Sequence, residues 1–168
     1  MRIVENALSK RSLELVHERI RRSLNQEVWA ASTLWWTPEI RRGNNTSVLT
    51  QTAPKTHMPF LERDLKKHLP PYSSLGIQYY LWPEGSNIST HDDRGDRLAG
   101  ATIYLNPEWH PDMGGLFVWT DGESQELKVL CPRMNMMVIN DKYEDHLVTP
   151  ITSACKEMRA TVQIWVYE

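Results

Sequence analysis

Residues 76–105 read GIQYYLWPEGSNISTHDDRGDRLAGATIYL and carry the clearest indication of the fold class. It begins with a β-rich run at 76–82, passes through turn residues at 83–87, and ends with a second β-rich run at 99–105. Further short β-rich runs, separated by turn residues, follow at 115–119, 126–130, 135–139, 144–148 and 159–167. Several short strands with turns between them predict an antiparallel sandwich or barrel.

Two helices are expected before this β-rich part. The first is indicated by apolar residues at helical spacing with charged residues between them, namely Leu13, Val16, Ile20 and Leu24. The second starts near Pro59 and runs through Leu69, where it ends because Pro70 cannot continue a helix. Between the helices, residues 26–55 predict a loop around 41–45 with strands on either side. The expected class is mainly β with flanking helices (α+β), which pack outside the β structure.

Length and composition favour one domain. The 168 residues are 40% hydrophobic and 24% charged, which suits a single domain over 1–168 with residues 1–73 supporting a β core at 74–168. The apolar runs are shorter than the roughly 20 residues that span a bilayer. A formal net charge of -2 provides no broad positive field for nucleic acid. We therefore expect neither a membrane nor a nucleic acid as a partner.

The first residues and the cysteines indicate the compartment. Residues 1–8 lack the basic segment and apolar core of a secretory signal, so a cytoplasmic location is expected. Cys131 and Cys155 form no CxxC pair and are expected to be reduced thiols. The oligomeric state stays open.

His91 and Asp93 are the first candidate metal ligands. In extended chain, side chains two residues apart point the same way, so these two can share one ion. Two histidines and one carboxylate are the ligand set of non-haem Fe(II) oxygenases. The candidates for the second histidine are His57, His68, His110 and His146. His146 is preferred because it lies in the expected strand 144–148, although an HxD triplet also arises by chance and a lone histidine is usually a packed or surface residue.

Arg159 and Thr161 are the candidate ligands of an anionic cosubstrate. They lie two residues apart in the last expected strand and therefore face the same side. Arginine binds a carboxylate with two parallel hydrogen bonds, and the threonine hydroxyl adds a donor. An arginine inside an apolar strand would otherwise be an unfavourable burial.

Over residues 77–167 the sequence resembles the prolyl-hydroxylase branch of the 2-oxoglutarate oxygenases. The shared features, in chain order, are His91-x-Asp93, Arg97, the run 103–106, Trp109, Gly114-Gly115, His146, Arg159 and Trp165. The resemblance implies a double-stranded β-helix (jelly-roll, cupin-like) of two packed sheets, with iron near one mouth and 2-oxoglutarate deeper inside. It implies Fe(II), 2-oxoglutarate and O2 as cofactor and cosubstrates, with ascorbate in a supporting role.

The resemblance also implies residue roles in the pocket. Arg159 would hold the distal carboxylate of 2-oxoglutarate, joined by the Tyr104 hydroxyl; the alternative for Tyr104 is a packed aromatic residue in a half-buried strand. The Gly114-Gly115 pair would allow a close approach or a positive φ. The segment from His146 to Arg159 is a little longer than in many relatives, so the loop at 152–157 is expected to be distinctive.

The substrate residues are less defined by the sequence. Arg97, Trp109 and Trp165 are candidates for the entrance, and each has a plain structural alternative. The aromatic residue upstream of the HxD triplet is Tyr79 or one of the pair Tyr80 and Trp82, which share a face. Tyr80 is carried forward with Arg97 and Trp165 as a substrate candidate.

The resemblance implies an enzyme that hydroxylates an unactivated carbon, with a prolyl residue in a peptide or protein as the expected substrate. The sequence leaves two alternatives open. One is a hydroxylase of a free amino acid or another small molecule, because a fold does not fix a substrate. The other is a noncatalytic metal-binding β-barrel.

Overall fold

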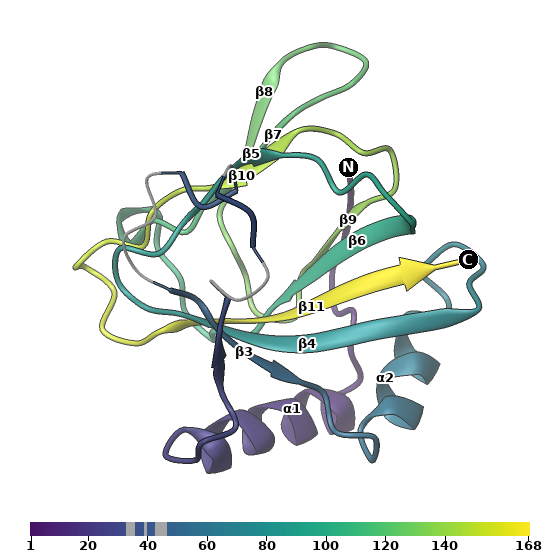
Figure 1. Ribbon diagram of the computed structural model, residues 1–168, viewed down its shortest axis with the longest axis vertical. Coiled ribbons are helices and arrows are strands. Elements are labelled where there is room, and N and C mark those ends of the chain that lie inside the picture. Colours follow the sequence, from purple (N-terminus) through teal and green to yellow (C-terminus); the bar gives the residue numbers. More distant parts are fainter. Residues whose placement is uncertain (33–35, 39, 43–46) are drawn as a thin grey trace.

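The computed structural model describes residues 1–32, 36–38, 40–42 and 47–168, and its strands form two antiparallel sheets packed face to face (Figure 1). The large sheet contains β1 (Arg2–Val4), β2 (Ala30–Ala31), β3 (Leu49–Thr52), β4 (Ser74–Trp82), β6 (Arg97–Tyr104), β9 (Met137–Asn140) and β11 (Arg159–Tyr167). The small sheet contains β5 (Ile88–His91), β7 (Phe117–Thr120), β8 (Leu127–Leu130) and β10 (His146–Val148). Their orders are β1-β9-β6-β11-β4-β3-β2 and β5-β10-β7-β8. This double-stranded β-helix confirms the predicted class.

Two helices, α1 (Lys10–Ser23) and α2 (Met58–Leu65), cover the outer face of the large sheet (Figure 1). Val16 and Leu61 are buried in the same core cluster as Ile77 of β4, so the helices bury their apolar faces on the sheet. α2 ends at Leu65, earlier than predicted, because the chain turns over 66–68, although Leu69 is still buried against the core. No helix in the described part of the chain is long and apolar enough to cross a membrane.

Asp64 of α2 connects the two helices by hydrogen bonds to the start of α1. Its Oδ2 accepts hydrogen bonds from the Ser9 backbone N–H at 2.8 Å and from the Ser12 hydroxyl at 2.5 Å. Ser9 is also the N-cap of α1, accepting from the Ser12 backbone N–H. Burial opposes ionisation, but the hydrogen bonds from Ser12 and Ser9 outweigh it and lower the pKa of Asp64 to about 2. The ionised carboxylate therefore anchors the start of α1.

The strand β11 lies in the middle of the large sheet, between β4 and β6 (Figure 1). Val162 and Ile164 are fully buried in the cluster beneath the helices. Arg159, Thr161 and Gln163 alternate with them and point to the opposite side, between the two sheets. The predicted alternation of this strand is confirmed, and it delivers polar side chains to the interior.

The N-terminal third contributes more than helices. β2 and β3 flank the predicted loop, as expected, although residues 43–45 of that loop lie outside the described residues. β1, which the sequence did not indicate, pairs with β9 through Ile3 opposite Val138. Both edge strands of the large sheet, β1 and β2, therefore come from the N-terminal third.

The Gly114-Gly115 pair has the predicted conformation, with φ values of 67° and 60°. A Cβ on Gly114 would overlap the carbonyl oxygen of Pro150, and one on Gly115 would lie 2.8 Å from Cδ of Arg159. Glycine is therefore needed for both reasons that the sequence suggested, the positive φ and the close approach.

Candidate metal centre

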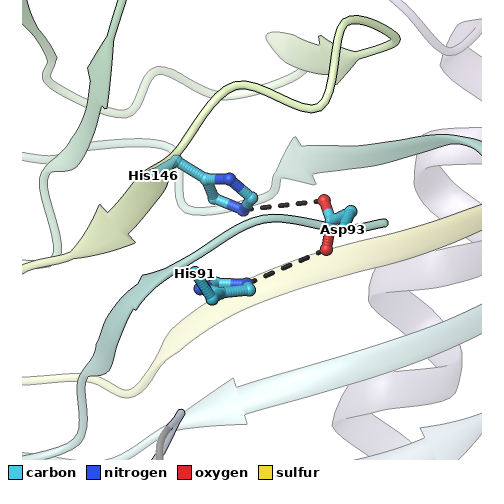
Figure 2. Close-up of side chains that lie close together, drawn as sticks. All are labelled: His91, Asp93 and His146. Carbon is cyan, nitrogen blue, oxygen red and sulfur yellow. Dashed lines mark ion pairs between the residues drawn. The ribbon is translucent and has the colours of Figure 1, made fainter. Parts of the chain in front are cut away.

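His91, Asp93 and His146 converge between the sheets (Figure 2). His91 is the last residue of β5, Asp93 follows two residues later, and His146 begins β10, where it pairs directly with His91. The Asp93 carboxylate lies 3.8 Å from Nε2 of His91 and 3.6 Å from Nε2 of His146. One potential ligand atom from each residue lies within 4.8 Å of the others. This arrangement suits a single ion bound on one face.

Backbone carbonyls orient both imidazoles. Nδ1 of His91 lies 2.8 Å from the Ser89 carbonyl oxygen, and Nδ1 of His146 lies 3.0 Å from the Glu144 carbonyl oxygen. A carbonyl only accepts, so each Nδ1 carries the proton and each Nε2 presents its lone pair to the centre. Burial lowers the pKa of both histidines, and the neighbouring His146 further lowers the pKa of His91. Both rings are thus held in the neutral, metal-binding form.

Gly100 on β6 makes room for the Asp93 carboxylate. A Cβ at this position would lie 2.5 Å from Oδ2 of Asp93 and 3.1 Å from Cζ3 of Trp165. The sequence placed Gly100 inside an expected strand but did not connect it with the site. An isolated glycine within a strand often marks a close approach of another group, which is the signal that Gly100 carries in the sequence.

Asn140 fixes the turn that carries His146. Its side chain donates to the Glu144 carbonyl oxygen at 3.0 Å and accepts from the Glu144 backbone N–H at 2.9 Å. The same carbonyl accepts from Nδ1 of His146. Asn140 therefore holds the group that orients a candidate ligand, a role that the sequence did not reveal.

The other candidate histidines lie away from this group. His57 hydrogen-bonds the Tyr79 hydroxyl at 2.9 Å beside α2, and His110 is exposed before a short 3-10 helix. His68 follows α2. Among the described residues, the potential metal-binding group contains His146, as preferred from the sequence.

A cavity of about 470 Å³ opens beside these side chains. Its lining includes the three candidate ligands and, among others, Trp36, Arg159 and Trp165. Such a volume accommodates a small cosubstrate and part of a substrate.

Arg159 lies at one end of the cavity with its charge unpaired. It is 1% exposed, and its three guanidinium nitrogens have no hydrogen-bond partner among the described residues. The hydroxyl of Tyr104 is likewise buried without a partner in the described part of the chain. The guanidinium lies 4.9 Å from the Trp82 ring centroid and 5.0 Å from that of Tyr104. A buried, unpaired cation beside a free hydroxyl fits one carboxylate of a dicarboxylate ligand.

Arg159 stays charged despite its burial. Burial lowers its pKa to about 10, and the nearby Tyr104 opposes that shift. Burial raises the pKa of Tyr104 to about 12, against the opposing charge of Arg159. At neutral pH the pair therefore presents a cation and a neutral hydroxyl donor.

Thr161 is fully buried opposite Tyr104 on the neighbouring strand. Its Oγ1 accepts a hydrogen bond from the Trp82 indole N–H at 3.1 Å. The threonine hydroxyl proton remains available as a donor. Trp82 thereby links Thr161 to the Arg159 guanidinium that lies over its ring.

The substrate candidates separate into two groups. Tyr80, Arg97 and Trp165 line the cavity, and the Arg97 guanidinium lies 3.9 Å from the Trp165 ring centroid. Trp109 does not line it; its indole N–H donates to the Gly114 carbonyl oxygen, so it stabilises a turn rather than the entrance. Tyr79 faces the helices, which leaves Tyr80 and Trp82 as the upstream aromatic residues of the pocket.

Trp36 lines the same cavity and was not predicted to do so. Its ring centroid lies 6.1 Å from that of Tyr80 and 5.8 Å from that of Trp82. The segment that carries it is attached to β5, because the Ser89 backbone N–H donates to the Ile40 carbonyl oxygen. Neither a helical nor a strand periodicity marks this segment, so its sequence does not indicate which way Trp36 faces.

A double-stranded β-helix that holds two histidines and a carboxylate beside a buried, unpaired arginine defines a non-haem iron oxygenase. The sequence model of the 2OG-Fe(II) oxygenase superfamily matches residues 75–167, and the chain belongs to that family. It is a 2-oxoglutarate-dependent dioxygenase, which uses Fe(II), 2-oxoglutarate and O2. The predicted family and cofactors are thereby confirmed. No curated protein sequence matches the chain.

Solved structures share the fold over nearly the whole chain. A prolyl-4-hydroxylase from Pseudomonas putida is 17% identical, with a TM-score of 0.77 and coverage of 99% of this chain and 92% of that one. A Trichoplax adhaerens prolyl hydroxylase, in complex with a hypoxia inducible factor peptide fragment, is 16% identical, with a TM-score of 0.76 and coverage of 99% and 82%. A viral collagen prolyl hydroxylase from Paramecium Bursaria Chlorella virus-1, in a 2OG complex, is 13% identical, with a TM-score of 0.63 and coverage of 98% and 94%.

Proposed function

We propose that this dioxygenase hydroxylates an unactivated carbon of a prolyl residue in a peptide or protein. His91, Asp93 and His146 bind the iron, and Arg159 binds the distal carboxylate of 2-oxoglutarate. The observation that carries these assignments is the buried, unpaired guanidinium of Arg159 in the same cavity as the three candidate ligands.

The residues of the chain have separate tasks in this proposal. The iron, 2-oxoglutarate and O2 together supply the oxidation, in which the cosubstrate becomes succinate and carbon dioxide and one oxygen atom enters the substrate. Tyr104 and Thr161 lie beside Arg159 behind the cavity lining and would add hydroxyl donors near its guanidinium. The Ser89 and Glu144 carbonyls keep both Nε2 atoms aimed at the ion.

The choice of a prolyl substrate rests on likeness to known proteins. Three of the similar structures are prolyl hydroxylases, and one of them is in complex with a peptide. In this chain, the cavity wall has the aromatic residues Trp36, Tyr80 and Trp82, whose faces suit an apolar ring. A free amino acid is the alternative substrate.

The test follows succinate formation. Protein purified without oxygen is mixed with Fe(II), 2-oxoglutarate and ascorbate, oxygen is admitted, and proline-containing peptides or free L-proline are added. We expect peptide-stimulated succinate formation that His91→Ala abolishes and His110→Ala preserves, because His110 is exposed and outside the site. Mass spectrometry should find a gain of one oxygen atom on the peptide. Stimulation by free proline alone would favour the small-molecule alternative.

A second measurement tests the noncatalytic alternative. Protein that binds Fe(II) but forms no succinate above the His91→Ala background, with or without peptide, would favour a noncatalytic metal-binding barrel.

A further inference from the structure

The floor of the cavity carries two neighbouring glutamines. Gln163 of β11 pairs in register with Gln78 of β4 on one side and with Thr102 of β6 on the other. All three line the cavity that also contains Asp93 and His146. Directly opposite residues on adjacent strands have Cβ atoms about 4.5 to 5.5 Å apart. The two carboxamides therefore lie side by side near the candidate metal ligands.

Hydroxyl groups fix the orientation of both carboxamides. The Thr102 hydroxyl donates to Oε1 of Gln163 at 2.7 Å, and the Tyr80 hydroxyl donates to Oε1 of Gln78 at 3.1 Å. Each oxygen is thereby engaged, and each Nε2 keeps its two N–H donors. Neither Nε2 has an acceptor among the residues that the structure describes. Gln163 is only 9% exposed and lines the cavity, so its free donors are available to an acceptor that enters the cavity.

A neutral oxygen atom suits these donors better than a carboxylate. The arginines of the cavity have other contacts: Arg94 pairs with Asp92 at 3.2 Å, Arg97 lies over the Trp165 ring, and Arg159 lies at the Trp82 and Tyr104 end. The two amides are neutral donors and offer an ionised carboxylate no positive charge of their own in exchange for its lost hydration. A carbonyl oxygen requires only hydrogen bonds.

We propose that Gln78 and Gln163 bind the substrate carbonyl oxygen that follows the prolyl ring, as a peptide group presents it, beside the metal centre. The inference rests on the proposed hydroxylase function and deepens it, because such a subsite selects an amide-linked substrate over a free amino acid. Gln78 and Gln163 act here by binding and positioning the substrate.

The experiment measures binding without turnover. Protein loaded with Mn(II) in place of Fe(II), and with 2-oxoglutarate, is titrated with three small probes whose NMR relaxation reports proximity to the ion. The probes are N-acetyl-L-prolinamide, N-acetyl-L-proline and N-acetylpyrrolidine, which carry a carboxamide, a carboxylate and neither group on the same ring. We expect the prolinamide to bind about ten-fold more tightly than N-acetylpyrrolidine, as one or two good hydrogen bonds provide.

Matched variants connect that preference to the glutamines. Gln163→Leu and Gln78→Leu keep side-chain volume but remove the donors, and each should abolish the preference for the prolinamide. Gln26→Leu should keep it, because Gln26 is exposed and does not line the cavity. Circular dichroism spectra and Mn(II) dissociation constants that match those of the unsubstituted protein show that the variants are folded.

Three results would overturn the inference. The first is equal binding of the prolinamide and N-acetylpyrrolidine to the unsubstituted protein. The second is tighter binding of N-acetyl-L-proline, which would assign the donors to a carboxylate. The third is weaker binding of 2-oxoglutarate in the glutamine variants, which would assign the donors to the cosubstrate. Succinate formation by the iron-loaded protein, measured without any probe, tests the proposed function separately.

Discussion

Replacing Gly100 by alanine should weaken metal binding without unfolding the protein. The added Cβ would lie 2.5 Å from Oδ2 of Asp93, whereas ordinary contact begins at 3.4 Å, so the carboxylate oxygen must move by about 0.9 Å. Trp165 blocks part of that movement, because its Cζ3 would lie 3.1 Å from the new methyl. Disturbing a group that supports a metal ligand commonly costs 10- to 100-fold in affinity.

We therefore expect Gly100→Ala to raise the dissociation constant for Fe(II) or Mn(II) about 10- to 100-fold, which is roughly 1.4 to 2.8 kcal/mol. Gly76→Ala is the matched control. Gly76 flanks Trp165 on the opposite side from Gly100, and its Cβ would make only ordinary contacts at 3.4 Å and beyond. Anaerobic titration calorimetry gives the affinity, and circular dichroism establishes folding.

Equal metal affinities of folded Gly100→Ala and Gly76→Ala proteins would refute the role of Gly100 in metal binding. That result would mean that Asp93 adapts freely, so that the glycine has no part in placing the carboxylate.

Three further substitutions test other parts of the structure. Arg159→Met should weaken 2-oxoglutarate binding roughly 10- to 100-fold, measured by titration of the Mn(II) protein, because charged hydrogen bonds contribute about 1.5 to 3 kcal/mol; unchanged binding would refute its assignment. Asp64→Asn should lower the free energy of unfolding at pH 7 by about 1 to 2 kcal/mol in urea melts. The pKa of Asp64 is lowered from 3.8 to about 2 in the folded protein, so the ionised carboxylate stabilises the fold fully above pH 3.8. The difference in unfolding free energy between the unsubstituted protein and Asp64→Asn should therefore shrink as the pH falls toward 2. Gly114→Ala should destabilise by at least about 2 kcal/mol, because it combines a positive φ with overlap on the Pro150 carbonyl; equal urea midpoints for Gly114→Ala and Gly122→Ala would contradict this.

Local patterns predicted the core strands and the candidate centre. The alternation in residues 159–167 places Arg159 and Thr161 on the face opposite Val162, and the structure has that arrangement. His91 and Asp93 are two residues apart, and in extended chain such side chains point the same way, so their shared site could also be predicted. These features depend on neighbouring residues, so one sequence is enough to indicate them.

Features that depend on distant contacts were not predicted. Short β1 carries no pattern of its own and forms because it adds to the edge of β9. The roles of Gly100 and Trp36 depend on what lies opposite them, Asp93 and Trp82 respectively. A sequence shows that such residues are present but does not show which partner the fold brings to them.

The central position of β11 affects how the protein is made. During synthesis, β4 and β6 emerge long before residues 159–167, and their facing edges have no partner until that last strand arrives. Unpaired edges of this kind invite pairing with other chains. The nascent chain is therefore most exposed to aggregation just before it gains both the middle of its large sheet and Arg159, so folding and cosubstrate binding become possible at the same moment.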